Sequence, residues 1–342
     1  MADNSIEIRN LYKIFGANGK KYVEAVEKGM SKDELNAKHG HVLGLKDINI
    51  SMPQAKIQVI MGLSGSGKST LIRHINRLIE PTVGEVIYQG EDVCKMSESE
   101  LLEFRRHKTA MVFQKFALLP HRTVINNTLF GLELQGINKK DSEERARHWL
   151  NRVGLDGYED RYPNELSGGM QQRVGLARAL TNDADILLMD EAFSALDPLI
   201  RNDMQGILLE LQEELHKTIV FITHDLDEAL RLGDRIAILR DGAVIQQGTG
   251  QEIVLNPADE YISDFVKEVN RGRVILVDTI MESGAAGTSN VSVPSGSRLE
   301  AAAKLLSESG EISANVVDDK GAVIGSVSMQ STINAMVTPA TH

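Results

Sequence analysis

The sequence is poor in cysteine and has no long apolar run. Cys94 is the single cysteine among 342 residues, so a disulfide within the chain is excluded and a reducing compartment is expected. No stretch reaches the roughly eighteen consecutive apolar residues of a transmembrane helix. The opening segment "MADNSIEIRN" lacks the basic-then-apolar pattern of a secretion signal. Any work at a membrane is therefore expected to need a partner.

Excess positive charge is also missing. The net charge is −11 and the sequence pI is about 5.4, which makes nonspecific binding to DNA, RNA or anionic lipid unfavourable. We therefore expect no nucleic-acid partner. With 42% hydrophobic and 25% charged residues, the composition suits a globular protein with one large domain and one small domain.

Short apolar runs alternate with amphipathic segments through the middle of the chain. This alternation predicts an α/β fold with a largely parallel sheet and helices on both faces. The N-terminal segment 5–15 alternates as an edge or hairpin strand. Together with the hairpins it is expected to form a separate antiparallel sheet. The predicted buried strands are 56–62, 184–191 and 217–225, the helices 68–81, 199–216 and 226–233, and the hairpins 84–93 and 235–248.

The segment "GLSGSGKS", Gly62–Ser69, fits the pattern G-x-x-x-x-G-K-[ST] between a predicted strand and a predicted helix. Its glycines allow backbone amides to converge on phosphate oxygens, and the helix N-terminus adds partial positive charge. We expect Lys68 to reach the β- and γ-phosphates of a nucleotide and Ser69 to hold Mg²⁺. The predicted nucleotide-binding set is Gly62, Ser64, Gly65, Ser66, Gly67, Lys68, Ser69 and Thr70.

Two carboxylates end the buried strand "ILLMDE", Ile186–Glu191. Ligands bind at the carboxyl edge of open α/β sheets, so both acids are expected to lie beside the nucleotide. Asp190 suits Mg²⁺, directly or through water. Glu191 suits a general base that activates the attacking water.

A second helix start with anion-binding chemistry occurs in "ELSGGMQQRVGLARAL", Glu165–Leu180. Ser167, Gly168 and Gly169 precede apolar positions at helical spacing. One chain does not need two such sites for one nucleotide. The pattern therefore predicts that this segment serves the nucleotide of another copy, in a head-to-tail homodimer that holds two nucleotides.

Together these motifs resemble those of the ATP-binding cassette (ABC) ATPases over residues 5–270. The resemblance implies a P-loop ABC ATPase domain with a RecA-like core sheet, an antiparallel β subdomain and a helical subdomain. Gly62–Thr70 is then the Walker A motif, Ile186–Glu191 the Walker B motif and Leu166–Met170 the signature motif.

The same resemblance implies roles for four further residues. Gln114 in "MVFQKF" senses Mg²⁺ and takes part in catalysis, and His224 in "FITHD" lies near the γ-phosphate. Asp197 in "SALD" belongs to a loop that crosses between the two sites of the dimer. Phe15 falls where the family stacks an aromatic ring on adenine. Taken alone, Gln114 or His224 would more often be an ordinary loop residue, and Phe15 would more often be a core residue.

Three features depart from the commoner family pattern. The adenine-stacking position holds Phe15 instead of tyrosine, and Met170 replaces a glutamine at the end of the signature motif. A helical insertion at about residues 17–41 separates Phe15 from the next strand. Within it, Ser31 and Glu34 form a capping-box pattern that predicts the start of a second short helix.

The motif set resembles most the ATP-binding subunits of glycine betaine/proline-type importers. That resemblance implies an ATPase that drives uptake of quaternary amines such as glycine betaine, proline betaine or choline. It also implies transmembrane permease subunits, an extracytoplasmic substrate-binding protein and a peripheral position on the cytoplasmic face of a bacterial inner membrane. The apolar segment 115–136 is expected to form the groove for the permease, with a place in the core as the alternative.

Two alternatives stay open at this point. One is a soluble ABC ATPase that is not coupled to transport, and the other is a P-loop kinase of a small metabolite. The kinase hypothesis leaves Ser167 and Asp197 without a role.

Residues 271–342 resemble one CBS unit after a linker rich in Gly, Ser and Ala, with a helix at 298–310 and a hairpin at 314–329. The chain is thus divided into 1–270 and a small α+β regulatory module.

Overall fold

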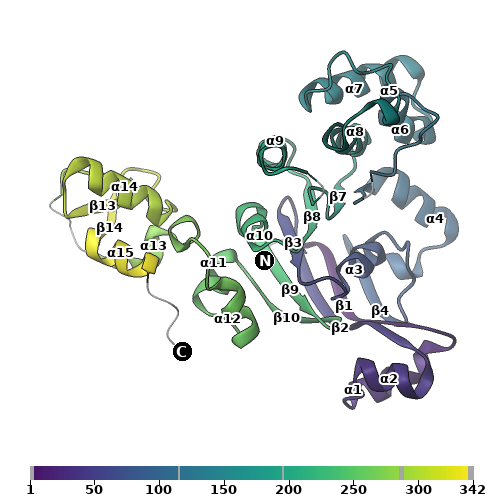
Figure 1. Ribbon diagram of the computed structural model, residues 1–342, viewed down its shortest axis with the longest axis horizontal. Coiled ribbons are helices and arrows are strands. Elements are labelled where there is room, and N and C mark those ends of the chain that lie inside the picture. The colour runs from purple at the N-terminus through teal and green to yellow at the C-terminus, as the bar shows by residue number, and fades with distance from the viewer. Residues whose placement is uncertain (1–3, 115, 195, 285–288, 338–342) are drawn as a thin grey trace. The chain divides into compact units, whose positions relative to one another are not determined.

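The computed structural model describes residues 4–114, 116–194, 196–284 and 289–337. The chain forms two compact units, Met1–Gln247 and Gly248–His342, which are taken separately below (Figure 1). Within the described ranges, no helix is long and apolar enough to cross a membrane.

A six-stranded sheet forms the centre of the first unit, with strand order β10-β9-β3-β8-β7-β6. β3 pairs in parallel with β8 and β9, and β7 pairs in parallel with β8 and β6. All residues of β3, β7 and β8 are buried, as expected for strands covered on both faces. The predicted parallel sheet is therefore confirmed. Its strands are β3 Ile57–Met61, β6 Thr109–Val112, β7 Ile186–Asp190, β8 Thr218–Thr223, β9 Arg235–Arg240 and β10 Ala243–Gly248.

A second sheet of the first unit is antiparallel and has the order β2-β1-β4-β5. β1 pairs with both β2 and β4, so the N-terminal strand lies inside the sheet and is not an edge strand. The hairpin 235–248 does not join this sheet, because β9 pairs with β3. The strands are β1 Asn4–Phe15, β2 Val42–Pro53, β4 Val83–Tyr88 and β5 Glu91–Asp92.

The inserted segment between β1 and β2 folds into η1 Gly19–Tyr22, α1 Val23–Glu27 and α2 Lys32–His39. The predicted capping box is present: Ser31 Oγ accepts from the Glu34 amide, and the Glu34 carboxylate accepts from the Ser31 amide. Buried Val26 and Leu35 pack in a small core of their own against Tyr12 and Ile14 of β1. The insertion is therefore an integral part of this sheet and not a loose loop.

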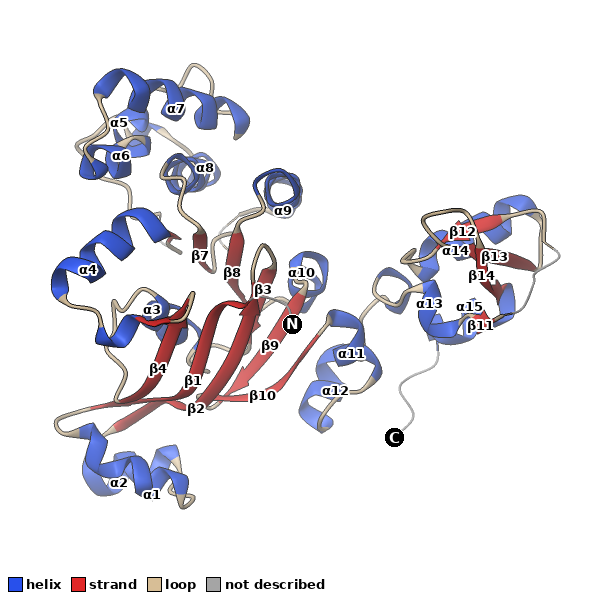
Figure 2. Cartoon of the chain, turned by 180° about the vertical axis from the view of Figure 1, so that it is seen from behind, coloured by secondary structure: helices blue, strands red, loops and turns tan. Residues whose placement is uncertain are grey.

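Helices flank the core sheet, and a separate group of helices gathers beyond the end of β7 (Figure 2). The first set is α3 Lys68–Ile75, α9 Pro198–Leu215 and α10 Leu226–Leu232. The helical subdomain contains α5 Val124–Thr128, α6 Phe130–Gln135, α7 Lys139–Arg152, η4 Pro163–Glu165 and α8 Gly168–Thr181. Between β5 and β6 lie η2 Val93–Lys95, α4 Glu98–Glu103 and a π-helical turn, Phe104–Lys108.

The second unit contains a four-stranded sheet with the order β11-β14-β13-β12. β13 and β14 pair antiparallel across the predicted turn, where the Asp318 carboxylate accepts from the amides of Lys320 and Ala322. Buried apolar residues of α14 and the sheet form its core. The elements are α11 Gly250–Leu255, α12 Glu260–Val266, η5 Arg271–Arg273, α13 Val277–Ile280, β11 Glu282–Ser283, β12 Ser292–Pro294, α14 Leu299–Ser309, β13 Ser313–Val317, β14 Val323–Ser328 and α15 Met329–Val337.

Candidate functional site

The glycine loop runs from the end of β3 to the start of α3, as predicted. Gly62 has φ +150°, and a Cβ there would lie 2.2 Å from the Leu239 carbonyl oxygen, so a side chain has no room. Gly67, with φ +104°, is the N-cap residue of α3. The Gly242 amide donates to the Ser66 carbonyl at 3.0 Å and ties the loop to the turn after β9. This packing holds the loop open at its tip, where Ser64 and Gly65 are exposed.

Lys68 is the first residue of α3 and is only 4% exposed. Its ammonium donates to the carbonyl oxygens of Gly62 at 2.8 Å and Leu63 at 3.1 Å. The Glu191 carboxylate lies 3.5 Å from the same Nζ atom. A buried ammonium is costly unless it is paired, so these three oxygens explain how the cation is held at the loop.

Asp190 ends β7 and is 2% exposed. Its Oδ1 accepts from the Ser69 hydroxyl at 2.8 Å, and its Oδ2 accepts from the Arg73 guanidinium at 3.3 Å. The structure therefore brings Ser69 and Asp190, two of the three residues predicted at the Mg²⁺ site, into contact and adds Arg73, which the sequence analysis missed. A signal was available: Ser69 and Arg73 are four residues apart, so both lie on one face of α3.

Glu191 joins three of the predicted residues at the carboxyl edge of the sheet. Its Oε2 accepts from Gln114 Nε2 at 2.9 Å and lies 3.6 Å from His224 Nδ1. Its Oε1 faces Lys68. The backbone of Glu191 has φ +46°, a left-handed conformation that is strained for a residue with a side chain. Side chains that follow β6, β7 and β8 thus converge on the phosphate loop, because the carboxyl ends of neighbouring parallel strands lie at the same edge of the sheet.

Two polar groups beneath the loop complete its surroundings. The Ser66 hydroxyl is buried and has no hydrogen-bond partner among the described residues. His74 of α3 is fully buried, and its Nδ1 lies 2.6 Å from the carbonyl oxygen of Thr70. Burial lowers the pKa of His74 to about 4, so this ring is neutral at physiological pH.

Phe15, the last residue of β1, lies beside the loop with 39% of its surface exposed. Its ring lies on Gly44, where an added Cβ would come within 2.7 Å of Phe15 Cε2. The Gly44 carbonyl in turn lies 2.8 Å from where a Cβ on Gly67 would be. The Lys13 ammonium is 5.1 Å from the ring centroid. An exposed aromatic face is therefore available next to the phosphate loop.

Ser167 and Asp197 both cap helices of their own. The Ser167 hydroxyl accepts from the Met170 amide at 3.3 Å at the start of α8, and Gly168 is exposed beside it. Asp197 Oδ1 accepts from the amides of Leu199 and Ile200 at the start of α9. In the described part of the chain, no hydrogen bond or ion pair links Ser167 or Gly169 to the cluster around Lys68. Ala195 of the predicted "SALD" loop lies outside the described residues.

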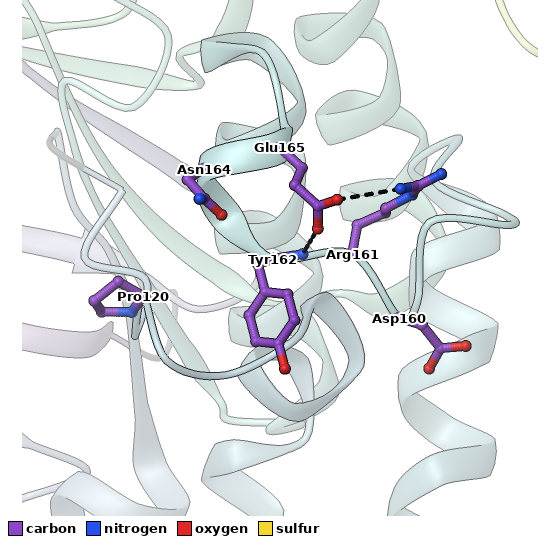
Figure 3. A pocket seen from close by; sticks show the side chains of 6 residues that line it. All are labelled: Pro120, Asp160, Arg161, Tyr162, Asn164 and Glu165. Carbon is purple, nitrogen blue, oxygen red and sulfur yellow. Dashed lines mark hydrogen bonds and ion pairs between the residues drawn. The ribbon is translucent and has the colours of Figure 1, made fainter.

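A polar hollow of about 750 Å³ lies in the helical subdomain, ahead of α8. It is lined by Pro120, Asp160, Arg161, Tyr162, Asn164 and Glu165, and Figure 3 shows the Glu165 carboxylate bonded to Arg161 and to the Tyr162 amide. Of the apolar side chains predicted to form a groove, Val124 is fully buried, whereas Phe116, Leu118, Leu119 and Phe130 are half-buried, so the groove stays a prediction. Pro120 is the residue of the predicted segment that reaches this hollow.

Comparison with known proteins gives the same assignment as the site. The ABC transporter family profile matches residues 45–194. The glycine betaine transport ATP-binding protein OpuAA of Bacillus subtilis is 54% identical over 81% of this chain and 66% of its own length. The glycine betaine/proline betaine transport system ATP-binding protein ProV of Escherichia coli is 50% identical over 97% of this chain and 82% of its own length.

A solved structure extends the comparison to the fold. The dimeric structure of a bacterial ABC transporter cassette matches with a TM-score of 0.62 and 32% identity, over 72% of this chain and 98% of that one. The predicted ABC ATPase fold, with its parallel core, antiparallel sheet and helical subdomain, is thereby confirmed. This chain belongs to the ABC transporter family of ATP-binding proteins.

Proposed function

We propose that this chain is the ATP-hydrolysing subunit of an importer for quaternary amines such as glycine betaine, proline betaine or choline. One observation carries the proposal: Lys68, Gln114 and His224 all converge on Glu191 at the mouth of the phosphate loop. The relatives named above, whose names specify glycine betaine transport, support the substrate class. The substrate itself does not contact this subunit.

The phosphate loop binds the triphosphate of ATP. The amides of Ser64, Gly65 and Gly67 and those at the start of α3, with Thr70 in its first turn, bind the phosphate oxygens, and Ser66, whose amide donates to the Leu63 carbonyl, helps to shape the loop. Lys68 exchanges its carbonyl partners for β- and γ-phosphate oxygens, since it is already held at the loop. Phe15 stacks on the adenine with its exposed face.

Mg²⁺ fits the oxygen donors at this point of the site. Ser69 and Asp190 offer a hydroxyl and a carboxylate, which suit a hard cation, and Gln114, whose Nε2 donates to Glu191, offers its amide oxygen. Magnesium keeps several water ligands and also takes phosphate oxygens of the nucleotide as ligands, so it needs few ligands from the protein. When bound, it would neutralise charge on the phosphates. Arg73 orients Asp190 by holding its second oxygen.

Hydrolysis depends on Glu191 as the general base. Its carboxylate accepts a proton from the attacking water, and Gln114 and His224 hold the carboxylate in place. In the structure Glu191 also faces Lys68, so the carboxylate becomes free to accept a proton when the lysine turns to the phosphates. His224 is about half exposed and can reach the γ-phosphate.

The active site is completed in a head-to-tail homodimer. Ser167, Gly168 and Gly169 of one copy contact the phosphates bound by the other, and Asp197 lies in the loop between the two sites. The start of α8 is exposed and, among the described residues, makes no polar contact to its own phosphate loop, which supports this arrangement. Similarity to a dimeric ABC transporter cassette supports it independently.

Permease subunits dock on the helical subdomain, where the polar hollow of Figure 3 accepts a segment of the membrane partner. The chain then acts at the cytoplasmic face of a bacterial inner membrane, and an extracytoplasmic binding protein delivers the amine. Residues 271–342 form a single CBS-like regulatory module. We place the boundary between the ATPase domain and this module near residue 270, after α11 and α12. The division into compact units falls earlier, between residues 247 and 248.

The test combines hydrolysis and transport. The Glu191→Gln variant should keep ATP binding, lose turnover by roughly 100-fold or more and accumulate as an ATP-bound dimer. Reconstituted with its neighbouring permease and binding protein, the parent chain should support uptake of labelled betaine or choline. Unchanged phosphate release in the variant would contradict the role of Glu191. Ribosome association without any membrane partner would instead favour a soluble ABC ATPase.

A further inference from the structure

His41 stands at the junction between the inserted helices and the start of β2. Its Nδ1 lies 2.7 Å from the His39 carbonyl oxygen, and its Nε2 lies 2.8 Å from the Ala17 carbonyl oxygen. A carbonyl oxygen can only accept a hydrogen bond, so both ring nitrogens must donate at the same time. A neutral imidazole has one N–H group, and only the imidazolium has two. Both contacts are hydrogen bonds together only when His41 is protonated.

The His41 ring occupies a site shaped for it. A Cβ on Gly16, which has φ +131°, would come within 2.4 Å of His41 Cδ2, so a glycine is needed directly after Phe15. On the other side the Tyr22 ring lies 4.6 Å from the His41 ring and 4.5 Å from the His39 ring. The inserted segment thus holds His41 against the turn that follows β1.

That turn carries the aromatic face beside the phosphate loop. Phe15 pairs with Val42, the residue after His41, in the β1–β2 register. The Nε2 bond of His41 to Ala17 fixes the chain two residues beyond Phe15. Because the ring of Phe15 also lies on Gly44, the turn and β2 together determine where the ring lies.

The charge of His41 comes from these carbonyl groups and not from an acid. The hydrogen bonds to Ala17 and His39 raise the pKa of His41 above its ordinary value of 6.5. Among the described residues, no carboxylate forms an ion pair with it. The titratable groups on the elements packed around it are Glu7, Arg9, Tyr12 and Lys13 of β1, Lys20, Lys21 and Tyr22 of η1, Glu24 and Glu27 of α1, Lys32, Asp33, Glu34, Lys38 and His39 of α2, and Lys46 and Asp47 of β2.

We propose that His41, as an imidazolium, is a positioning residue for the nucleotide base: it fixes the turn after Phe15 and so places the ring on which adenine stacks. This inference rests on the proposed function, in which Phe15 contacts adenine. His41 acts through the turn and does not touch the nucleotide. Below its ordinary pKa both bonds are present. As the pH rises through the raised pKa, one bond is lost and the affinity for ATP falls.

The test separates the base end of the nucleotide from the phosphate end. Binding of Mg-ATP and of Mg-tripolyphosphate is measured by calorimetry on the full chain carrying Glu191→Gln, from about pH 6 to about pH 9. The dissociation constant for ATP should rise roughly three- to tenfold over this range, and that for tripolyphosphate should not follow it. Adding His41→Ala should give the weaker ATP value at every pH. Adding His39→Ala, which keeps the carbonyl acceptor, should preserve the pH response.

A second measurement does not depend on any variant folding correctly. The NMR titration of the His41 Cε1 proton in the parent chain should report a pKa above 6.5. An ordinary or lowered value would overturn the proposal, as would a pH response that persists in His41→Ala or an equal loss of tripolyphosphate affinity. Failure of the parent to bind ATP at every pH would overturn the proposed function itself, and this inference with it.

Discussion

Two helices of the first unit begin with the same anion-binding chemistry but in opposite surroundings. At the start of α3, Lys68 and Ser69 are held by carbonyl groups and by the two consecutive carboxylates, Asp190 and Glu191, at the end of β7. At the start of α8, Ser167 caps its own helix and stands exposed. The first site is assembled within one chain, whereas the described part of the chain supplies no partner for the second, which we propose serves the nucleotide of another copy.

The largest effect is expected from a substitution at the start of α3, measured as a loss of ATP affinity. Lys68→Ala removes the buried ammonium that is aimed at the phosphates. We expect the dissociation constant for Mg-ATP to rise by roughly 100-fold or more, because charged hydrogen bonds to phosphate are lost in a site closed to water. Calorimetry measures this change. Lys95→Ala, an exposed lysine with only surface ion pairs, is the matched control and should bind ATP as the parent does.

A substitution at the start of α8 should lower the rate of ATP hydrolysis but leave the affinity of the single chain for ATP nearly unchanged. Ser167→Arg places a long cation where the phosphates of the second copy are expected. Steady-state hydrolysis should fall about 100-fold, while the affinity of the separate chain for ATP changes by less than about twofold. Ser97→Arg removes an equivalent helix cap at α4 and should leave hydrolysis unchanged. If Ser167→Arg turned over normally, the second helix start would have no part in the active site.

A smaller effect tests the network behind α3. Arg73→Gln removes the cation that holds Asp190 Oδ2 but leaves the Ser69 bond to Oδ1. We expect the Mg²⁺ concentration for half-maximal hydrolysis to rise by about threefold to tenfold, since the carboxylate is held less firmly. Affinity for ATP without metal should stay within about twofold. A metal requirement equal to that of the parent would show that Arg73 does not orient this carboxylate.

The smallest effect on catalysis is expected from His74, a buried residue of α3 that should affect the pH dependence of stability. Burial lowers the pKa of His74 on α3, whereas the buried face of α8 holds no acidic or histidine side chain. Because the folded chain excludes a proton that the unfolded chain accepts, stability is full above pH 6.5 and falls toward pH 4. This group contributes up to about 3 kcal/mol to that loss. Urea unfolding of His74→Gln should show a flatter pH profile, and exposed His148→Gln should not.

Local patterns account for what could be predicted. The apolar run before Gly62, the glycines themselves and Lys68 specify a strand, a turn and a helix start in one short segment. The capping box of Ser31 and Glu34 is likewise a contact between residues three apart, and it is present as predicted. The motif order then gave the family, which the comparisons confirm.

Contacts between distant segments escaped prediction. Arg73 reaches Asp190 across 117 positions of the chain, and only the placing of α3 near the end of β7 brings them together. The alternating pattern of β1 predicts a strand but not its neighbours, and β1 lies inside its sheet because β4 pairs with the edge that β2 does not occupy. In the apolar segment 115–136, Val124 is buried but Phe116, Leu118 and Leu119 are half-buried, and the same side chains suit a groove or a helix interface until their neighbours are known.

The sequence by itself determined the phosphate loop, the strand ending in two carboxylates and the second helix start, because each is a local pattern whose chemistry follows from spacing along one element. Only the tertiary structure decided that Gln114, His224 and Lys68 converge on Glu191, and that both ring nitrogens of His41 face carbonyl oxygens. These arrangements depend on strand order and on an insertion folding back onto its sheet. Both are set by packing over the whole domain and not by any single segment.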